Sequence, residues 1–206
     1  MPDSDSLINL KEDYNMKNLY HYSILADLFR YPSEKMKDKI AIWRKTIYGF
    51  DPELIMKLEP FISHITDHPL SLQQEYFIST FDVQPLCTLD IGYVLFGEDY
   101  RRGDFLVNMK KEHIKAGNDC GSELPDHLTN ILTLIPRISD ADLAEELIYS
   151  LIIPALHEMI FRFKKGDNLY KGLLEILVTV MVTDYPESRF ERFSFRREEK
   201  NMVQDR

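Results

Sequence analysis

A dense group of polar residues stands just before an apolar run near residue 125. The group consists of Glu123, Pro125, Asp126 and His127. A helix start needs only one capping oxygen and, often, a proline in its first turn. Glu123 as the cap and Pro125 in the first turn would account for two of the four residues. Asp126 and His127 are left over, and a carboxylate and an imidazole can serve catalysis, metal binding or recognition.

The histidines do not form a recognisable metal motif. His64 and His68 have the i,i+4 spacing that can place two imidazoles on one helix face, but Pro69 follows at once. A solvated helix terminus is therefore the favoured interpretation. The Asp-His pair at 126–127 reverses the order that metal phosphohydrolases of the HD class use. His157 is followed by one glutamate, whereas ferritin-like sites need two Glu-x-x-His units. The sequence predicts no metal site.

Other catalytic patterns are also missing from the sequence. It contains no glycine-rich phosphate loop and no Gly-x-Ser-x-Gly nucleophile elbow. Neither Cys87 nor Cys120 has the local sequence of a catalytic thiol, and their spacing does not indicate a secreted disulfide framework. Paired carboxylates are frequent, but most such pairs lie on solvated faces or at helix caps. The residues alone therefore indicate a soluble helical protein without recognisable catalytic chemistry, and no cofactor is expected.

The charge balance and the apolar runs bear on partners and on location. The net charge is −9, which disfavours nucleic acid as a partner and suits a basic one. The acidic, polar segment 1–17 is unlike a signal peptide. The longest apolar run, 147–156, is shorter than the roughly 20 residues of a membrane span and is broken by Pro154. We expect a cytoplasmic protein without membrane insertion.

Helices must position these residues, because apolar residues recur at intervals of three and four along most of the chain. Tyr31-Pro32 should end the first helix, since the residue before a proline avoids the helical region. Asp51-Pro52 is a strong start signal, and Ser139 or Asp140 should cap a long helix that Pro154 bends. The expected helices cover residues 18–30, 33–48, 51–62, 70–80, 86–96, 100–116, 125–138, 140–165 and 168–183.

This pattern predicts an all-α, single-domain helical bundle of about eight or nine helices, since strand-type alternation is essentially absent. The domain should cover residues 18–185, after a flexible N-terminal segment at 1–17. In the fourth expected helix, Leu72, Tyr76 and Phe77 are expected to face the core.

Two segments leave alternatives open. Residues 86–96 fit either a short buried helix, which we prefer, or an irregular connection. The tail 186–206 holds six basic and five acidic residues, with Phe190, Phe193 and Phe195 interleaved among arginines. A frayed surface segment is the favoured interpretation of this tail. The alternative is a segment that docks onto this subunit or another one.

Several short motifs follow one another in a fixed order between residues 73 and 132. They are Glu75-Tyr76, Thr80-Phe81-Asp82, Leu95-Phe96-Gly97-Glu98, Arg102-Gly103, Ala116-Gly117 and the Glu-Leu-Pro-Asp-His-Leu stretch at 123–128. In this order they resemble the NarJ-type respiratory nitrate reductase assembly chaperones, which belong to the TorD/DmsD redox-enzyme maturation family. The stretch ending in Tyr-Pro at 25–32 is also similar to the first helix of that family. The likeness is close over 73–132 and looser over 19–183.

The resemblance implies an all-α chaperone for the immature molybdenum-containing catalytic subunit of a nitrate-reductase-like oxidoreductase. Such proteins are not enzymes, and the resemblance implies the same for this chain. They bind an N-terminal peptide of this client, often a twin-arginine leader. They delay export or membrane docking until the cofactor and the iron–sulfur cluster are inserted. Helix exchange between protomers occurs in the family, so a homodimer is an open alternative. Because a leader is basic and apolar, its receptor should offer an apolar groove with an acidic rim.

The same motifs supply candidate client-binding residues, which are Glu123, Pro125, Asp126, His127, Asp82, Tyr93, Phe96, Glu98, Arg102 and Phe105. Neighbouring helical residues point about 100° apart, so Asp126 and His127 cannot share a face. We expect one to pin the preceding loop and the other to face the groove, with pure capping as the alternative. A structural salt bridge is the alternative for Asp82 and Arg102. Core packing is the alternative for Tyr93, Phe96 and Phe105.

Two other classes of function compete with this interpretation. A metal-dependent helical-bundle hydrolase would contain stoichiometric iron, manganese or zinc after purification. A helical adaptor for an unrelated protein would not bind the leader of a molybdoenzyme.

Overall fold

The computed structural model describes residues 19–83, 87–163 and 168–195. These residues form helices and connecting loops without a strand, so the predicted all-α single-domain bundle is confirmed. The expected flexible segment at 1–17, the expected helix end at Lys165 and the tail beyond residue 195 lie outside the described residues.

The expected helices of the N-terminal half are present, several of them with a 3-10 turn at one end. In chain order the elements are α2 (His21–Ala26), η2 (Asp27–Phe29), η3 (Glu34–Lys39), α3 (Ile40–Phe50), η4 (Pro52–Leu54), α4 (Ile55–Asp67) and α5 (Leu70–Phe81). Asp51 caps η4 as predicted, because its carboxylate accepts a hydrogen bond from the N–H of Glu53 at 2.8 Å. Proline fits directly after this cap, where an amide has no intrahelical partner.

The C-terminal half continues the bundle. Its elements are α6 (Ile91–Phe96), α7 (Arg101–Lys115), α8 (Leu128–Leu134), η5 (Ile135–Arg137), α9 (Ala141–Glu146), the π-helix η6 (Leu147–Ile152), α10 (Ile153–Arg162) and α11 (Leu169–Asp184). Among the described helices, α7 and α11 are the two longest. Of the two expected caps before α9, Asp140 accepts hydrogen bonds from the N–H groups of Asp142 and Leu143. Asn168 caps α11 in the same way, through the N–H of Tyr170.

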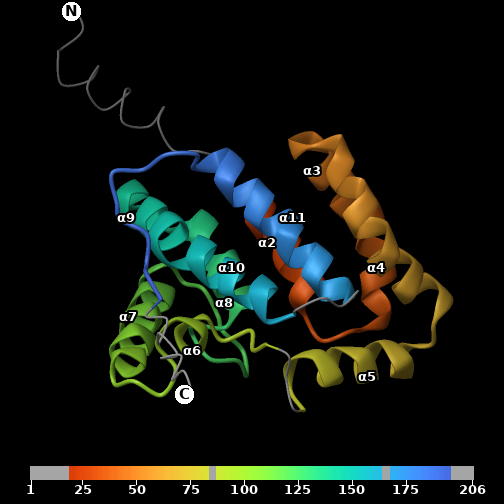
Figure 1. Cartoon of the computed structure of the whole chain (residues 1–206), viewed down its shortest axis with the longest axis horizontal. Helices are drawn as coiled ribbons and strands as arrows, with labels where there is room; N and C mark the ends of the chain where they lie inside the picture. The colour runs from red at the N-terminus through yellow and green to blue at the C-terminus, as the bar shows by residue number, and fades with distance from the viewer. Residues whose placement is uncertain (1–18, 84–86, 164–167, 196–206) are drawn as a thin grey trace, which may run out of the picture.

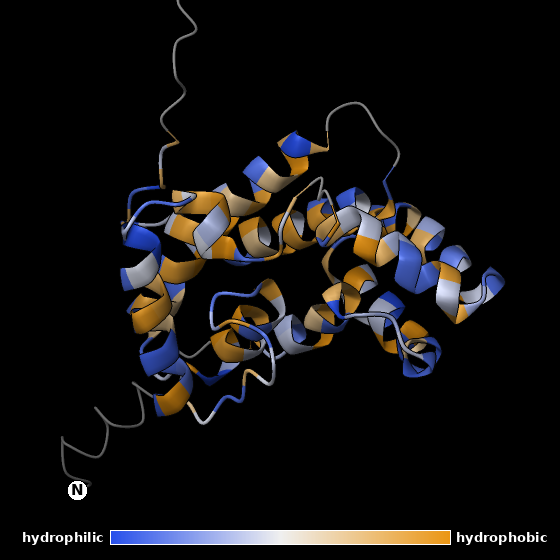
Figure 2. Cartoon of the chain, turned by 90° about the horizontal axis from the view of Figure 1, so that it is seen from below, coloured by the Kyte–Doolittle hydropathy of each residue, from blue (hydrophilic) through white to orange (hydrophobic). Residues whose placement is uncertain are grey.

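The helices surround one hydrophobic core. Helix α11 packs against α10 on one side and against α3 and α4 on the other, and α2 packs against α8 and α3 (Figure 1). Tyr22, Trp43 and Tyr170 are among the largest fully buried side chains. Hydrophobic and hydrophilic positions share most helices (Figure 2), as expected where each helix buries one face. Within the described ranges, no helix has the length and apolar character needed to cross a membrane.

Helix α5 faces the core through residues other than those expected. Leu72 is 45% exposed, so the expectation that it faces the core is wrong, whereas Phe77 is buried and Tyr76 is half-buried. Gln73 takes the inward position, because its amide donates to two backbone carbonyls at the end of α4 at 3.0 and 2.9 Å. A buried polar group is tolerated when its hydrogen bonds are made.

Two helices begin later in the chain than their local sequence predicts. Helix α8 does not open at Pro125, and α6 also starts late in its expected range. The segments before the two helices pair with each other instead. The N–H of Ile91 donates to the carbonyl of Asp126 at 3.0 Å, and the N–H of Leu128 donates to the carbonyl of Leu89 at 2.8 Å. Periodicity within either segment cannot reveal this pairing, because the partners are far apart in sequence.

The expected bend at Pro154 takes the form of a π-helical segment, η6, between α9 and α10. Proline has no N–H, so Pro154 cannot donate to the carbonyl of Ser150, four residues earlier. This carbonyl instead accepts a hydrogen bond from the backbone N–H of Phe193 at 2.8 Å. The described part of the C-terminal tail therefore docks onto its own subunit, at the point where the helical ladder is interrupted.

Candidate functional site

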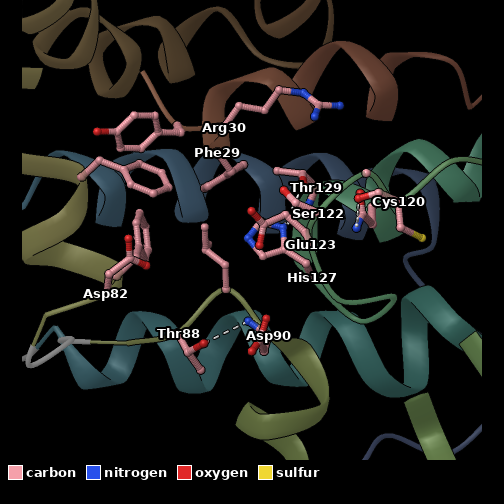
Figure 3. A pocket seen from close by; sticks show the side chains of 16 residues that line it. Phe29, Arg30, Asp82, Thr88, Asp90, Cys120, Ser122, Glu123, His127 and Thr129 are labelled. Atoms are coloured by element: carbon pink, nitrogen blue, oxygen red, sulfur yellow. Dashed lines mark hydrogen bonds between the residues drawn. The ribbon is translucent and has the colours of Figure 1, made fainter. Parts of the chain in front are cut away.

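A pocket with a volume of about 510 Å³ lies between the ends of α2 and α5 and the loop that leads into α8 (Figure 3). Part of its wall is aromatic, formed by Phe29, Phe77 and Phe81. The loop side contributes Ser122, Glu123 and the imidazole of His127, while Asp82 projects from the end of α5. The pocket thus combines apolar walls with polar groups from four separate segments, because Arg30 follows η2 and Asp90 precedes α6.

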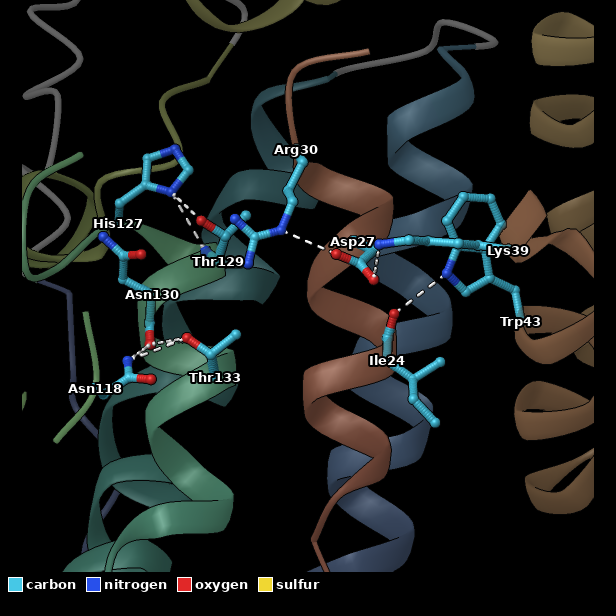
Figure 4. A network of polar contacts seen from close by, with 10 residues as sticks. All are labelled: Ile24, Asp27, Arg30, Lys39, Trp43, Asn118, His127, Thr129, Asn130 and Thr133. Carbon is cyan, nitrogen blue, oxygen red and sulfur yellow. Dashed lines mark hydrogen bonds and ion pairs between the residues drawn. The ribbon is translucent and has the colours of Figure 1, made fainter. Parts of the chain in front are cut away.

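The pocket is acidic. Its lining holds three carboxylates, Asp82, Asp90 and Glu123, and one guanidinium, Arg30. The positive charge of Arg30 is paired with the carboxylate of Asp27, because the Nε of Arg30 donates to Asp27 at 2.9 Å (Figure 4). Because Asp82 and Glu123 are exposed, they remain free to meet a basic group that enters from solvent.

Asp126 lies behind the pocket rather than in it. Its side chain is 0% exposed, and its Oδ2 accepts a hydrogen bond from the N–H of Gly92 at 3.0 Å. Burial raises the pKa of this carboxyl, while the Gly92 N–H and the guanidinium of Arg102 oppose the rise. Direct contact between Asp126 and a ligand is therefore excluded by its burial. It pins the start of α6 to the loop before α8.

His127 faces the pocket and also starts α8. Its Nδ1 accepts a hydrogen bond from the N–H of Thr129 at 3.3 Å, and the Thr129 hydroxyl lies 2.8 Å from the same nitrogen (Figure 4). A backbone N–H can only donate, so Nδ1 carries no proton and the proton of the neutral ring is on Nε2. Burial lowers the pKa of His127, and the charge of Asp90 opposes this shift. The cap of α8 is therefore His127, and Glu123 does not serve as the cap.

A second histidine holds the loop that carries the pocket residues. His113 of α7 is buried, and its Nε2 donates to the carbonyl of Pro125 at 2.8 Å. Its Nδ1 accepts from the amide of Asn118 at 2.9 Å, and the same amide lies 3.1 Å from the Thr133 hydroxyl. Asn130 adds donations to two loop carbonyls, at positions 120 and 124. Pro125 thus has a structural role, as the acceptor that connects the loop to α7.

Arg102 forms a structural salt bridge, which was the alternative to client contact. Its guanidinium lies 3.4 Å from Asp90 and 5.1 Å from the centre of the Tyr93 ring. Burial raises the pKa of Asp90, as does the charge of Asp126, while His127 and Arg102 lower it. These groups fix one wall of the pocket, and Tyr93 reaches the pocket only through Arg102 and Asp90.

The remaining candidates lie away from the pocket. Phe105 is 9% exposed and packs in the core, which was the alternative for this residue. The Phe96 ring lies 5.7 Å from that of Phe105 and 5.4 Å from that of Phe193 in the tail. Glu98 is exposed beyond the end of α6. The structure therefore joins Asp82, Glu123 and His127 in one site and leaves these three residues outside it.

Sequence reasoning missed Asp90 and the aromatic wall. Asp90 carries no motif of its own, and it reaches the pocket because its backbone forms an isolated bridge with His127. Phe29 and Phe77 fit the helical periodicity as core positions, which gives no sign that they also line a pocket.

Comparison with known proteins adds no relative to these observations. No family model matches the sequence, and no curated protein is significantly similar to it. In the part of the chain that the structure describes, no three His, Cys, Asp or Glu side chains form a group that could hold a metal ion.

Proposed function

We propose that this chain is a cytoplasmic assembly chaperone of the NarJ type. It binds the N-terminal region of an immature molybdenum-containing catalytic subunit and keeps that region from export or membrane docking during cofactor insertion. The sequence motifs at 73–132 motivate the proposal, and the acidic, aromatic-walled pocket carries it.

The chemistry of the pocket complements a basic, apolar peptide. Tyr31 lines the same pocket, is 50% exposed and offers aromatic surface on which an aliphatic side chain or a guanidinium can pack. Its ring lies 5.6 Å from that of Phe77, which is nearly buried together with Phe29 and Phe81. Asp82 and Glu123 stand where a lysine or arginine of the same peptide can pair with a carboxylate. Such rim charges act mainly on the rate of encounter and on orientation, and apolar burial provides most of the affinity.

The experiment is a titration of the purified protein with the N-terminal peptide of the molybdoenzyme catalytic subunit encoded beside it. Replacing both rim acids, Asp82→Asn with Glu123→Gln, should weaken binding by roughly two- to tenfold at low salt, because two exposed ion pairs are lost. The difference should shrink as salt rises, since exposed charges are screened beyond about 10 Å at 0.1 M.

Asp38→Asn with Glu53→Gln provides the matched control, because it removes the same number of exposed carboxylates outside the pocket and should leave the affinity close to that of the natural protein. Absence of peptide binding would refute the proposal. An equal loss in this control variant would refute the assignment of the pocket. Asp126→Ala is unsuitable here, because the buried position of Asp126 makes its loss a change in folding.

A further inference from the structure

Helix α6 connects the pocket to the C-terminal tail. Its residues Ile91, Gly92, Val94 and Leu95 are buried. The half-buried positions are Asp90, Tyr93 and Phe96, which follow one another at intervals of three and so lie along one side of the helix. This row, which we call the α6 row, runs from the pocket at Asp90 to the end of the helix at Phe96. At 1.5 Å per residue, the row spans about 9 Å, the length of roughly three extended residues.

The tail occupies the far end of the α6 row. The ring of Phe193 meets Phe96 edge to face at 5.4 Å, and the ring of Phe195 lies 5.1 Å from that of Phe193. The N–H of Phe193 donates to the carbonyl of Ser150, beside the interruption at Pro154. Both tail rings pack against the core. In Figure 1 the tail descends from the end of α11 past α9 toward α6 and α7.

Polar contacts hold the tail along α9 and η6. The guanidinium of Arg192 lies 4.5 Å from the centre of the Tyr149 ring, and the Ser188 hydroxyl donates to Glu145 at 2.6 Å. Arg189 pairs with Asp142 at 2.5 Å on the exposed surface. We call residues 188–195 the strap. It is an arginine- and phenylalanine-rich segment held by aromatic rings, carboxylates and a backbone acceptor.

The strap and the proposed client share the same chemistry, because both are basic and apolar. We propose that the strap is an intramolecular competitor for the client. A client segment whose basic residue enters the pocket and whose chain follows the α6 row reaches Phe96 only when Phe193 has left it. There the client supplies its own large apolar side chain to Phe96. This inference rests on the proposed function and adds a second, distal part to the client site.

The competition has a measurable size. When only a fraction of the molecules has a free site, the apparent dissociation constant is the intrinsic one divided by that fraction. A strap that is docked roughly nine-tenths of the time therefore weakens client binding about tenfold. A variant with a weakly docked strap should therefore bind the client up to about tenfold more tightly, although its pocket is unchanged.

The test uses the full chain with Phe193→Ala, which removes the ring that contacts Phe96. Phe190→Ala is the matched control, since Phe190 is in the same tail but its ring contact is with Arg189. The probe is the N-terminal peptide used above. Phe193→Ala should bind it several-fold more tightly than the natural protein, and Phe190→Ala should not. Amide hydrogen exchange at Phe193 should speed up when the natural protein is saturated with this peptide.

The possible results separate the two proposals. Peptide binding with equal affinity in all three proteins, or with unchanged exchange at Phe193, overturns the strap inference and leaves the proposed function standing. Binding by none of the three proteins overturns the proposed function and the strap inference together.

Discussion

At the scale of single residues, two histidines show how neutral imidazoles organise this site. His113 and His127 each use one ring nitrogen as a hydrogen-bond acceptor, from Asn118 and Thr129 respectively. A protonated ring has two donors and no acceptor, so both hydrogen bonds require the neutral form. Burial lowers the pKa of both histidines in the folded protein. The folded state therefore binds fewer protons than the unfolded state just below the ordinary pKa of histidine.

The first prediction follows from His127. The unfolded ring takes up a proton as pH falls below about 6.5, while the folded ring does so only at lower pH, so the free energy of unfolding should fall as pH drops from 7.5 to about 5.5. His127→Asn keeps a good capping side chain and removes the titration, so its stability should fall less over this range. Chemical denaturation at several pH values measures this. His157→Asn, which removes an exposed histidine of α10, is the control. An equally weak pH dependence in His157→Asn and His127→Asn would contradict the prediction.

At the scale of elements, α6 is held by close contact at one glycine. A Cβ built on Gly92 would lie 2.6 Å from Oδ2 of Asp126 and 2.9 Å from the ring of Phe105. Both distances are too short for any side chain without movement of a buried neighbour. Gly92 is therefore the position at which α6, α7 and the loop before α8 meet.

The second prediction concerns this contact. Gly92→Ala should lower the free energy of unfolding by about 1–3 kcal/mol, because the added methyl group overpacks a filled site. Thermal or urea unfolding measures the change. Gly103→Ala is the control, since Gly103 lies in α7 with open space around it and should gain roughly 0.5–1 kcal/mol from the better helix propensity of alanine. Equal unfolding midpoints for Gly92→Ala and the natural protein would show that α6 shifts enough to accommodate the added methyl group.

The elements also show which helix starts can be predicted from local sequence. The caps at Asp51, Asp140 and Asn168 are predictable or readily recognised, because a capping side chain contacts residues two or three positions away. The predicted start of α8 at Pro125 is wrong. The segment around His127 pairs with the segment around Asp90 instead of beginning a helix. Such long-range pairing decides the geometry of the pocket, and it leaves no trace in helical periodicity.

At the scale of the whole molecule, the first and last described helices are tied together. The hydroxyl of Tyr22 in α2 donates to Oδ2 of Asp184 at 2.6 Å, and Nε2 of His21 lies 2.8 Å from the same oxygen. Tyr22 is fully buried. Burial, followed by the hydrogen bond and charge of Asp184, raises the pKa of Tyr22 far above its usual range. The hydroxyl is therefore a permanent donor that requires this carboxylate.

The third prediction tests this tie. Asp184→Ala should cost about 1–3 kcal/mol of unfolding free energy, because it leaves the buried hydroxyl of Tyr22 without this acceptor. Adding Tyr22→Phe removes the unsatisfied hydroxyl and should recover part of the loss. Denaturant unfolding of the two single variants and the double variant measures the coupling. Strict additivity would show that the hydrogen bond contributes nothing to stability.

The fold class was predictable because helical periodicity extends over most of the chain, but the candidate site was predictable only in part. Glu123, His127 and Asp82 could be chosen from motifs. The burial of Asp126 was not predictable, since it results from the packing of its loop against Gly92 of α6. Phe193 was visible as an aromatic residue in the tail. Its docking position depends on the carbonyl of Ser150, which only the three-dimensional structure reveals.

The hydrogen bond between Phe193 and Ser150 also fixes the number of residues that must connect α11 to the docked strap. Side chains alternate along an extended chain, so Phe193 and Phe195 share a side, and the present register places the Phe193 ring against Phe96. Inserting a single residue between Tyr185 and Phe193 would shift that register or force the added residue to bulge out. A fluorescent reporter fused after Arg206 leaves this spacing unchanged, whereas one inserted at 186–192 does not.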